Sequence, residues 1–115
     1  MSKDIILIIG ANGQLGSVLI KELQTIHGIH KVIASDVYSV PNFEGIFELL
    51  DATDKAAIHE IVKQYSVTQI YHLAAILSAK GEEQPLWTWD LNMKMMLNVF
   101  EVARLTAINK VFFPS

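Results

Sequence analysis

The fold is decided by residues 5–16, which read Ile5-Ile-Leu-Ile-Ile-Gly10-Ala-Asn-Gly13-Gln-Leu-Gly16. The first five are apolar and mostly β-branched, and the run is too short to cross a membrane, so it predicts a buried parallel strand. Three glycines spaced three apart follow directly. They predict a turn that opens a helix at Gln14. Backbone N–H groups and the positive end of the helix dipole then converge on one point, which suits a pyrophosphate.

Each glycine has a separate task in such a turn. Gly10 permits the tight turn, Gly13 lets the backbone approach a phosphate, and Gly16 lets the helix pack close to the strand. A second signal is Asp36, which ends the next apolar strand and lies 20 residues beyond Gly16. A carboxylate there accepts hydrogen bonds from an adenosine ribose. The pattern predicts a dinucleotide site.

The carboxylate of Asp36 also predicts which dinucleotide binds. The 2′-phosphate of NADP would meet like charge, worth roughly 1 to 4 kcal/mol at about 4 Å. No arginine adjoins Asp36 to offset this repulsion, and Lys31 lies at the far end of the strand. We therefore expect NAD as the cofactor.

Strands and helices alternate along the rest of the chain. This alternation predicts an α/β fold, a doubly wound, Rossmann-like parallel sheet with strand order 3-2-1-4-5 and a ligand crevice where the order reverses. Asp54 is expected to cap the second helix. The expected helices are 14–26 (with Leu15, Val18, Leu19, Leu23 and Ile26 at helical spacing), 54–65 (with Ile58, Ile61 and Val62 inward) and 86–106; the strands after the first are 30–36, 46–50, 69–73 and 110–113.

Composition excludes several classes of function. The 115 residues predict one domain, and a net charge of −3 without a basic cluster argues against nucleic acid or an anionic membrane as partner. The absence of cysteine excludes thiol chemistry and fits a cytoplasmic protein. No stretch is long enough for a transmembrane helix. The histidines are scattered, so no metal site is expected, and His72 is interpreted as a strand residue.

Further motifs add up to a family. The glycine loop, Asp36, Asp51, His72-Leu-Ala-Ala75 and Asn92 together resemble the extended short-chain dehydrogenase/reductases, the NAD-dependent epimerase/dehydratase family. Within it, the segments Ile70–Gly81, Trp87–Asn92 and Lys110–Ser115 resemble the short-chain type of L-threonine 3-dehydrogenases. The resemblance covers the whole chain.

The resemblance implies roles for individual residues. Asp51 would accept a hydrogen bond from the adenine amino group, with the Ala52 amide on the ring. Residues 73–75 would lie beside the nicotinamide half of the dinucleotide. Asn92 would face the cofactor site, and Ser78 would contact the substrate. The implied cofactor-binding set is Gly10, Asn12, Gly13, Gln14, Leu15, Gly16, Asp36, Asp51, Ala52, Leu73, Ala74, Ala75 and Asn92.

One departure from the family concerns the catalytic residues. The family works with a Tyr-x-x-x-Lys pair and a serine or threonine after strand five. The residues four positions beyond Tyr38, Tyr65 and Tyr71 are asparagine, glutamine and alanine. Ser115 lies only next to the position expected for the catalytic hydroxyl. We therefore expect residues 1–115 to be an incomplete NAD-binding domain, truncated after strand five, without a catalytic residue of its own.

Three functions stay open at this point. The resemblance favours the NAD-binding part of an enzyme that oxidises L-threonine to 2-amino-3-ketobutyrate. A sugar-nucleotide epimerase or dehydratase would share the same half, and a non-catalytic dinucleotide-binding fragment is the third reading. The helix rich in methionine is apolar on more than one face, which predicts burial. Together with the open edge of strand five it predicts self-association or a homodimer.

Overall fold

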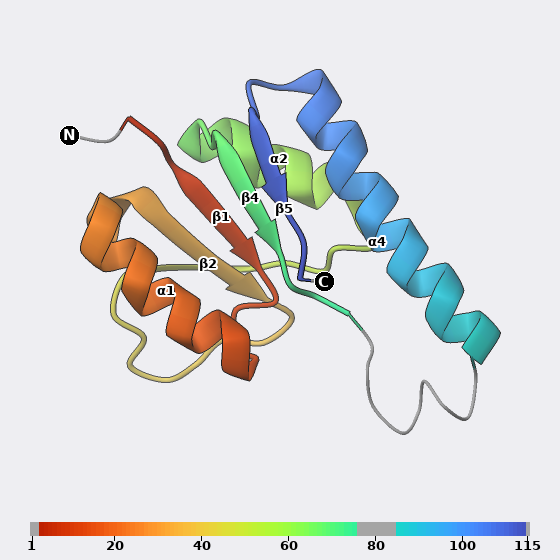
Figure 1. The fold of residues 1–115 in the computed structure, drawn as a ribbon, viewed down its shortest axis with the longest axis horizontal. Helices are drawn as coiled ribbons and strands as arrows, with labels where there is room; N and C mark the ends of the chain where they lie inside the picture. The colour runs from red at the N-terminus through yellow and green to blue at the C-terminus, as the bar shows by residue number, and fades with distance from the viewer. Residues whose placement is uncertain (1–2, 76–84, 115) are drawn as a thin grey trace.

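The sheet has the predicted topology. A computed structural model describes residues 3–75 and 85–114. In them five parallel strands pair in the order β3-β2-β1-β4-β5, which confirms the predicted order (Figure 1). The strands are β1 (Ile6–Ile9), β2 (Val32–Asp36), β3 (Ile46–Leu49), β4 (Gln69–His72) and β5 (Lys110–Phe112).

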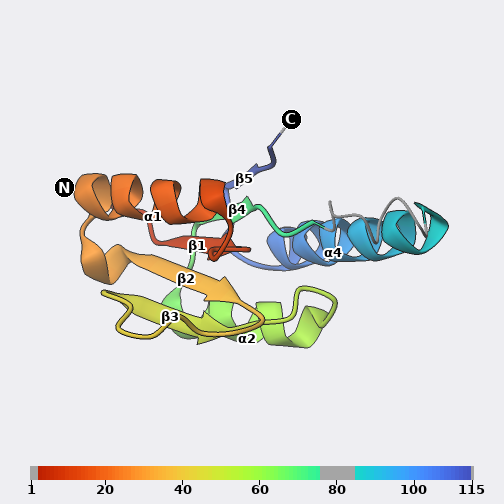
Figure 2. The same cartoon turned by 90° about the horizontal axis from the view of Figure 1, so that it is seen from below.

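Helices cover the two faces of the sheet unequally. Helix α1 (Gln14–His27) lies on one face, whereas α2 (Lys55–Tyr65) and α4 (Pro85–Leu105) lie on the other (Figures 1 and 2). A short 3₁₀ helix, η1 (Ile29–Lys31), precedes β2. The second strand therefore begins at Val32 and not at residue 30 as predicted, because the chain first completes a tight turn.

The central strand is the core of the fold. All four residues of β1 are buried, and they alternate between two apolar clusters. Leu7 and Ile9 face α2 and α4, while Ile6 and Ile8 face α1. A strand covered on both faces is a near-continuous apolar run, as residues 5–9 are.

The inward face of α1 differs from the apolar residues that identified the helix. Its buried residues are Gly16, Ile20 and Leu23, which are spaced by one helical turn. Leu15, Val18 and Ile26 are more than half exposed. The helix takes this rotation because Gly16 packs directly on the backbone of Ala11.

Helix α2 follows the prediction closely. The carboxylate of Asp54 accepts a hydrogen bond from the Ala57 amide at 3.2 Å, which is the predicted N-cap. Ile58, Ile61 and Val62 point inward as expected. Its last residue, Tyr65, donates a hydrogen bond to the carboxylate of Glu48 on β3, and this raises the pKa of the Tyr65 phenol.

Burial of α4 is confined to one face. Met95, Val99 and Val102 are buried, but Leu97 and Phe100 are exposed. Within one chain only the inner face of this helix is buried, and burial of its outer apolar face by a second copy stays a prediction. The physical reason is that the sheet and α2 cover only the inner side of the helix, and its first turns run beyond the sheet (Figures 1 and 2).

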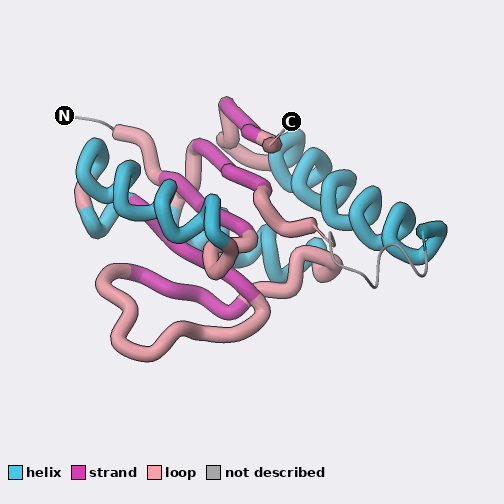
Figure 3. The backbone as a smooth tube through the Cα atoms, turned by 60° about the horizontal axis from the view of Figure 1, so that its bottom comes forward, coloured by secondary structure: helices cyan, strands magenta, loops and turns pink. Residues whose placement is uncertain are grey.

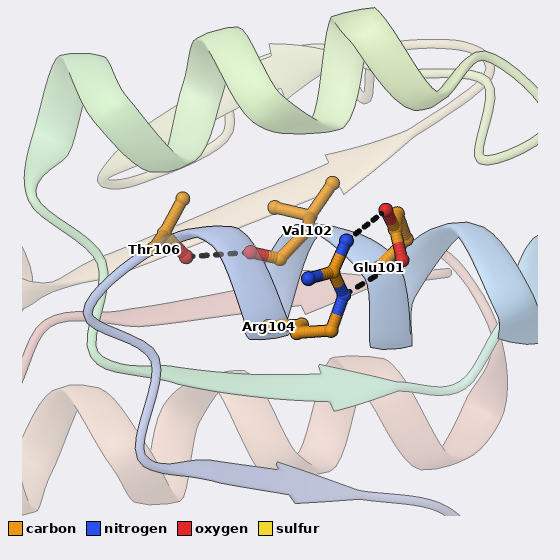
Figure 4. A network of polar contacts seen from close by, with 4 residues as sticks. All are labelled: Glu101, Val102, Arg104 and Thr106. Atoms are coloured by element: carbon orange, nitrogen blue, oxygen red, sulfur yellow. Dashed lines mark hydrogen bonds and ion pairs between the residues drawn. The ribbon is translucent and has the colours of Figure 1, made fainter.

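The carboxyl end of α4 is closed by local polar contacts (Figure 4). The hydroxyl of Thr106 donates to the Val102 carbonyl at 2.7 Å, satisfying one of the last carbonyl groups of the helix. Arg104 forms an ion pair with Glu101 at 2.7 Å on the exposed surface. Among the residues in 3–75 and 85–114, no helix is long and apolar enough to cross a membrane.

Candidate functional site

The site lies where the strands end. Because the strands are parallel, their carboxyl ends meet at one edge of the sheet, and the segments after β1, β2 and β4 gather there (Figures 1 and 3). The amides of Gly10 and Ala11 both donate to the Ser35 carbonyl, at 3.0 and 2.9 Å. The Leu73 amide donates to the Ile9 carbonyl at 2.8 Å. This edge is the predicted switch point.

The three glycines meet different surroundings. Gly10 has a φ of +87°, and a Cβ there would lie 2.6 Å from the backbone nitrogen of Ala74. A Cβ on Gly16 would lie 2.6 Å from the Ala11 carbonyl oxygen. A Cβ on Gly13 would meet nothing nearer than 3.8 Å. The fold itself therefore requires glycine at 10 and 16, whereas Gly13 leaves open space that a ligand can enter.

The amino end of α1 is prepared for an anion. Gly13 is the N-cap, no side chain caps the helix, and its first turn holds no acidic residue. The first N–H groups of a helix have no partner inside it. Together with the helix dipole they bind phosphate groups well.

Asp36 is joined to the glycine loop. Its Oδ2 accepts a hydrogen bond from the Asn12 amide at 3.0 Å, and its Oδ1 accepts one from the Val37 amide at 2.7 Å. The Asn12 side chain donates to the Tyr38 carbonyl at 2.7 Å. A carboxylate has about four acceptor positions, so both oxygens of Asp36 keep capacity for hydroxyl donors. The predicted ribose acid and phosphate loop thus form one unit.

Residues 51–54 form a second compact loop. Oδ1 of Asp51 accepts from the amide and the hydroxyl of Thr53, at 2.9 and 2.8 Å. These two bonds lower the pKa of the Asp51 carboxyl, burial opposes them, and the charge of Lys94 adds a lesser lowering effect. The side chain is exposed and ionised, so it can accept further hydrogen bonds.

A residue that the sequence analysis missed supports this loop. The side-chain amide of Asn98 on α4 donates to the Ala52 carbonyl at 3.0 Å. Ala52 is itself buried in the core. The available signal was an asparagine inside a helix, beside the apolar Val99, at a position where asparagine has poor helix propensity.

The segment that follows β4 contributes mainly backbone atoms to this edge of the sheet. The backbone of Ala74 lies against Gly10, and Leu73 packs toward α1. His72 is a buried strand residue, as predicted, and burial lowers the pKa of its imidazole. Its ring meets that of Phe113 edge-on at 5.5 Å, and its Nδ1 has no hydrogen-bond partner among residues 3–75 and 85–114.

The remaining predicted residues are less closely tied to this edge. Asn92 is half-buried on α4, and its contact with a cofactor stays a prediction. Ser78 and Ser115 lie outside the described residues. Within the described ranges, no three histidine, aspartate or glutamate side chains are grouped to hold a metal ion.

A separate hollow of about 840 Å³ lies beside the site. It is bounded by α1 and by residues 40–44, with Lys21, Gln24 and Phe43 in its wall, and it shares Ala11 and Asn12 with the glycine loop.

Comparison with known proteins defines the class. Residues 6–115 match the NAD dependent epimerase/dehydratase family, so the chain belongs to this family. An uncharacterised epimerase/dehydratase of Staphylococcus saprophyticus is 42% identical over 103 residues, which are 86% of this chain and 32% of that protein. The chain thus spans about a third of the curated relatives that it matches.

Solved structures give a narrower likeness. A partial consensus L-threonine 3-dehydrogenase is 49% identical with a TM-score of 0.90, over 96% of this chain and 36% of that one. The holo form of a GalE-like L-threonine dehydrogenase from Cupriavidus necator is 46% identical with a TM-score of 0.91, over the same shares.

Proposed function

We propose that this chain is the NAD-binding portion of an NAD-dependent oxidoreductase. The observation that carries the proposal is the direct hydrogen bond from the Asn12 amide to the Asp36 carboxylate at 3.0 Å. It holds Asp36, the proposed ribose-binding acid, beside an uncapped helix terminus with an open glycine, Gly13. A diphosphate and its adenosine ribose need these two elements side by side.

The residues present fit each part of the dinucleotide. The first N–H groups of α1 would hold the pyrophosphate, with Gly13 allowing close approach. Asp36 would accept from the ribose hydroxyls, and Asp51 from the adenine amino group. The backbone of residues 73–75 would lie along the nicotinamide half. Bound there, NAD supplies a hydride acceptor.

We further propose that the whole protein is an L-threonine 3-dehydrogenase, which oxidises the β-hydroxyl of L-threonine to give 2-amino-3-ketobutyrate. The support is the likeness to two L-threonine dehydrogenases at 49% and 46% identity. These residues contain no Tyr-x-x-x-Lys pair. We therefore expect the 115 residues to bind NAD without oxidising the substrate.

A second candidate is a sugar-nucleotide epimerase or dehydratase. It is favoured by the family match and by the 42% identical relative, whose name is epimerase/dehydratase. Both candidates use the same NAD-binding half, so the decisive difference between them is expected in the substrate-binding part of the whole protein.

Calorimetric titration of the chain with NAD and with NADP tests the cofactor proposal. We expect NAD to bind and NADP to bind more weakly. Equal affinity would contradict the assigned role of Asp36, and no binding of either would contradict NAD binding by this chain. A parallel assay for NADH with L-threonine is expected to show no turnover, and turnover would refute our reading of the catalytic residues.

A further inference from the structure

Helix α4 reaches the loop that carries Asp51. The Nδ2 of Asn98 donates to the Ala52 carbonyl at 3.0 Å across 46 positions of sequence. Asn98 is half-buried, and its neighbour Val99 is fully buried against the sheet. The donor is thus held on a rigid, packed helix.

The loop is otherwise bonded mainly to itself. Thr53 donates twice to Oδ1 of Asp51, and the Asp54 amide donates to the Asp51 carbonyl at 2.9 Å. These contacts fix the shape of residues 51–54, while the burial of Ala52 and the cap that Asp54 makes on α2 hold the loop against the core. The bond from Asn98 adds a directional connection from α4 to the Ala52 carbonyl.

A second residue of α4 acts on the same loop. Lys94 lies one turn before Asn98, and its charge helps to lower the pKa of the Asp51 carboxyl. Lys94 and Asn98 are four positions apart, so they lie on the same side of α4.

We propose that Asn98 is a positioning residue of the dinucleotide site, holding the Asp51–Ala52 loop where it can meet the adenine ring. This inference rests on the proposed function, since it takes the ring to lie at Asp51. Asn98 does not touch the cofactor; it acts through the Ala52 carbonyl.

The test compares two dinucleotides. Nicotinamide hypoxanthine dinucleotide carries a carbonyl oxygen in place of the adenine amino group, so it lacks the amino donor that is proposed to reach Asp51. We expect Asn98→Ala to lower the affinity for NAD about five-fold, the usual effect of one hydrogen bond, and the affinity for the hypoxanthine analogue less than about two-fold. Asn98→Gln, which keeps an amide donor, is expected to restore part of the affinity. Asn109→Ala is the matched control, because Asn109 precedes β5 at the opposite edge of the sheet.

Amide hydrogen exchange on the free chain tests the positioning without ligand. We expect Asn98→Ala to speed exchange at Thr53 and Asp54 while leaving the Asn12 amide unchanged. Uniformly faster exchange through the sheet, or an equal loss of affinity for both dinucleotides, would overturn the proposal. If the unsubstituted chain binds no NAD, the proposed function fails, and exchange at residues 53–54 still decides whether Asn98 positions the loop.

Discussion

The two halves of the sheet differ in how completely they are covered. β1 and the first four residues of β2 are buried, and the loops that follow them are bonded to each other. On the other side, Phe112 and Phe113 at the end of β5 are each more than a third exposed. Only β4 pairs with β5 among the described residues. β1 and β2, which lead into the proposed dinucleotide site, are thus covered by the described residues, whereas β5 leaves apolar side chains exposed.

Substitution of Gly10 and of Gly13 tests the packing described for the turn between β1 and α1. Gly10→Ala places a Cβ against the Ala74 backbone at positive φ, so we expect it to lower the free energy of unfolding by about 3 to 5 kcal/mol. Gly13→Ala is the control, since space is open there; because alanine is a poorer N-cap than glycine, it is expected to lower the free energy of unfolding by only about 0.5 to 1 kcal/mol yet to weaken NAD binding. Chemical denaturation and calorimetry measure both effects. A stable Gly10→Ala protein would contradict the described packing.

Removing the charge of Asp36 tests whether this carboxylate selects NAD over NADP. We expect Asp36→Ala to weaken NAD binding and to narrow the preference over NADP by roughly 1 to 4 kcal/mol, because the repulsion of the 2′-phosphate is lost. Titration with both dinucleotides measures the ratio. An unchanged ratio would show that Asp36 does not contact the ribose.

Self-association of the chain tests whether the exposed edge at β5 is an interface between two copies. Phe112 stacks on Tyr71 at 4.4 Å, and no strand of the described part of the chain pairs with the outer side of β5. We propose self-association through this edge, and expect the double substitution Phe112→Ser and Phe113→Ser to weaken it about tenfold, since each phenylalanine buries apolar area. Val18→Ser, on the exposed side of α1, is the control. A monomer by sedimentation velocity before any substitution would contradict this proposal.

The buried imidazole of His72 is expected to make the stability of the fold depend on pH, with a smaller effect than the substitutions above. Burial lowers the pKa of His72, so at acid pH the unfolded chain binds a proton that the folded chain does not. Stability is therefore expected to fall as pH drops below about 6.5, by at most about 1.4 kcal/mol per pH unit. His72→Gln is expected to flatten this slope, and His30→Gln, exposed on η1, to retain it. Denaturation at several pH values gives the slopes; equal slopes for the three proteins would refute the assignment to His72.

The sequence predicts the fold well because its signals are local. A buried strand, spaced glycines and an acid after the next strand follow one another within 36 residues, and parallel strands with crossover helices allow few topologies. The Asp54 cap and the inward residues of α2 were predictable for the same reason.

Contacts between distant segments were not predictable. The bond from Asn98 to Ala52 and the bond from Tyr65 to Glu48 depend on how helices pack on the sheet. The rotation of α1 was also missed, since Leu15, Val18 and Ile26 have the spacing of an inward face but Gly16 decides the packing. Hydrophobic periodicity identifies a helix better than it identifies the buried side.

The most direct test of NAD binding at the switch point is to follow backbone amide resonances during titration with NAD. We predict that the resonances that move belong to residues 10–16, 36–37, 51–53 and 73–75. Changes confined to the hollow lined by Lys21, Gln24 and Phe43 would place the ligand elsewhere and contradict the account.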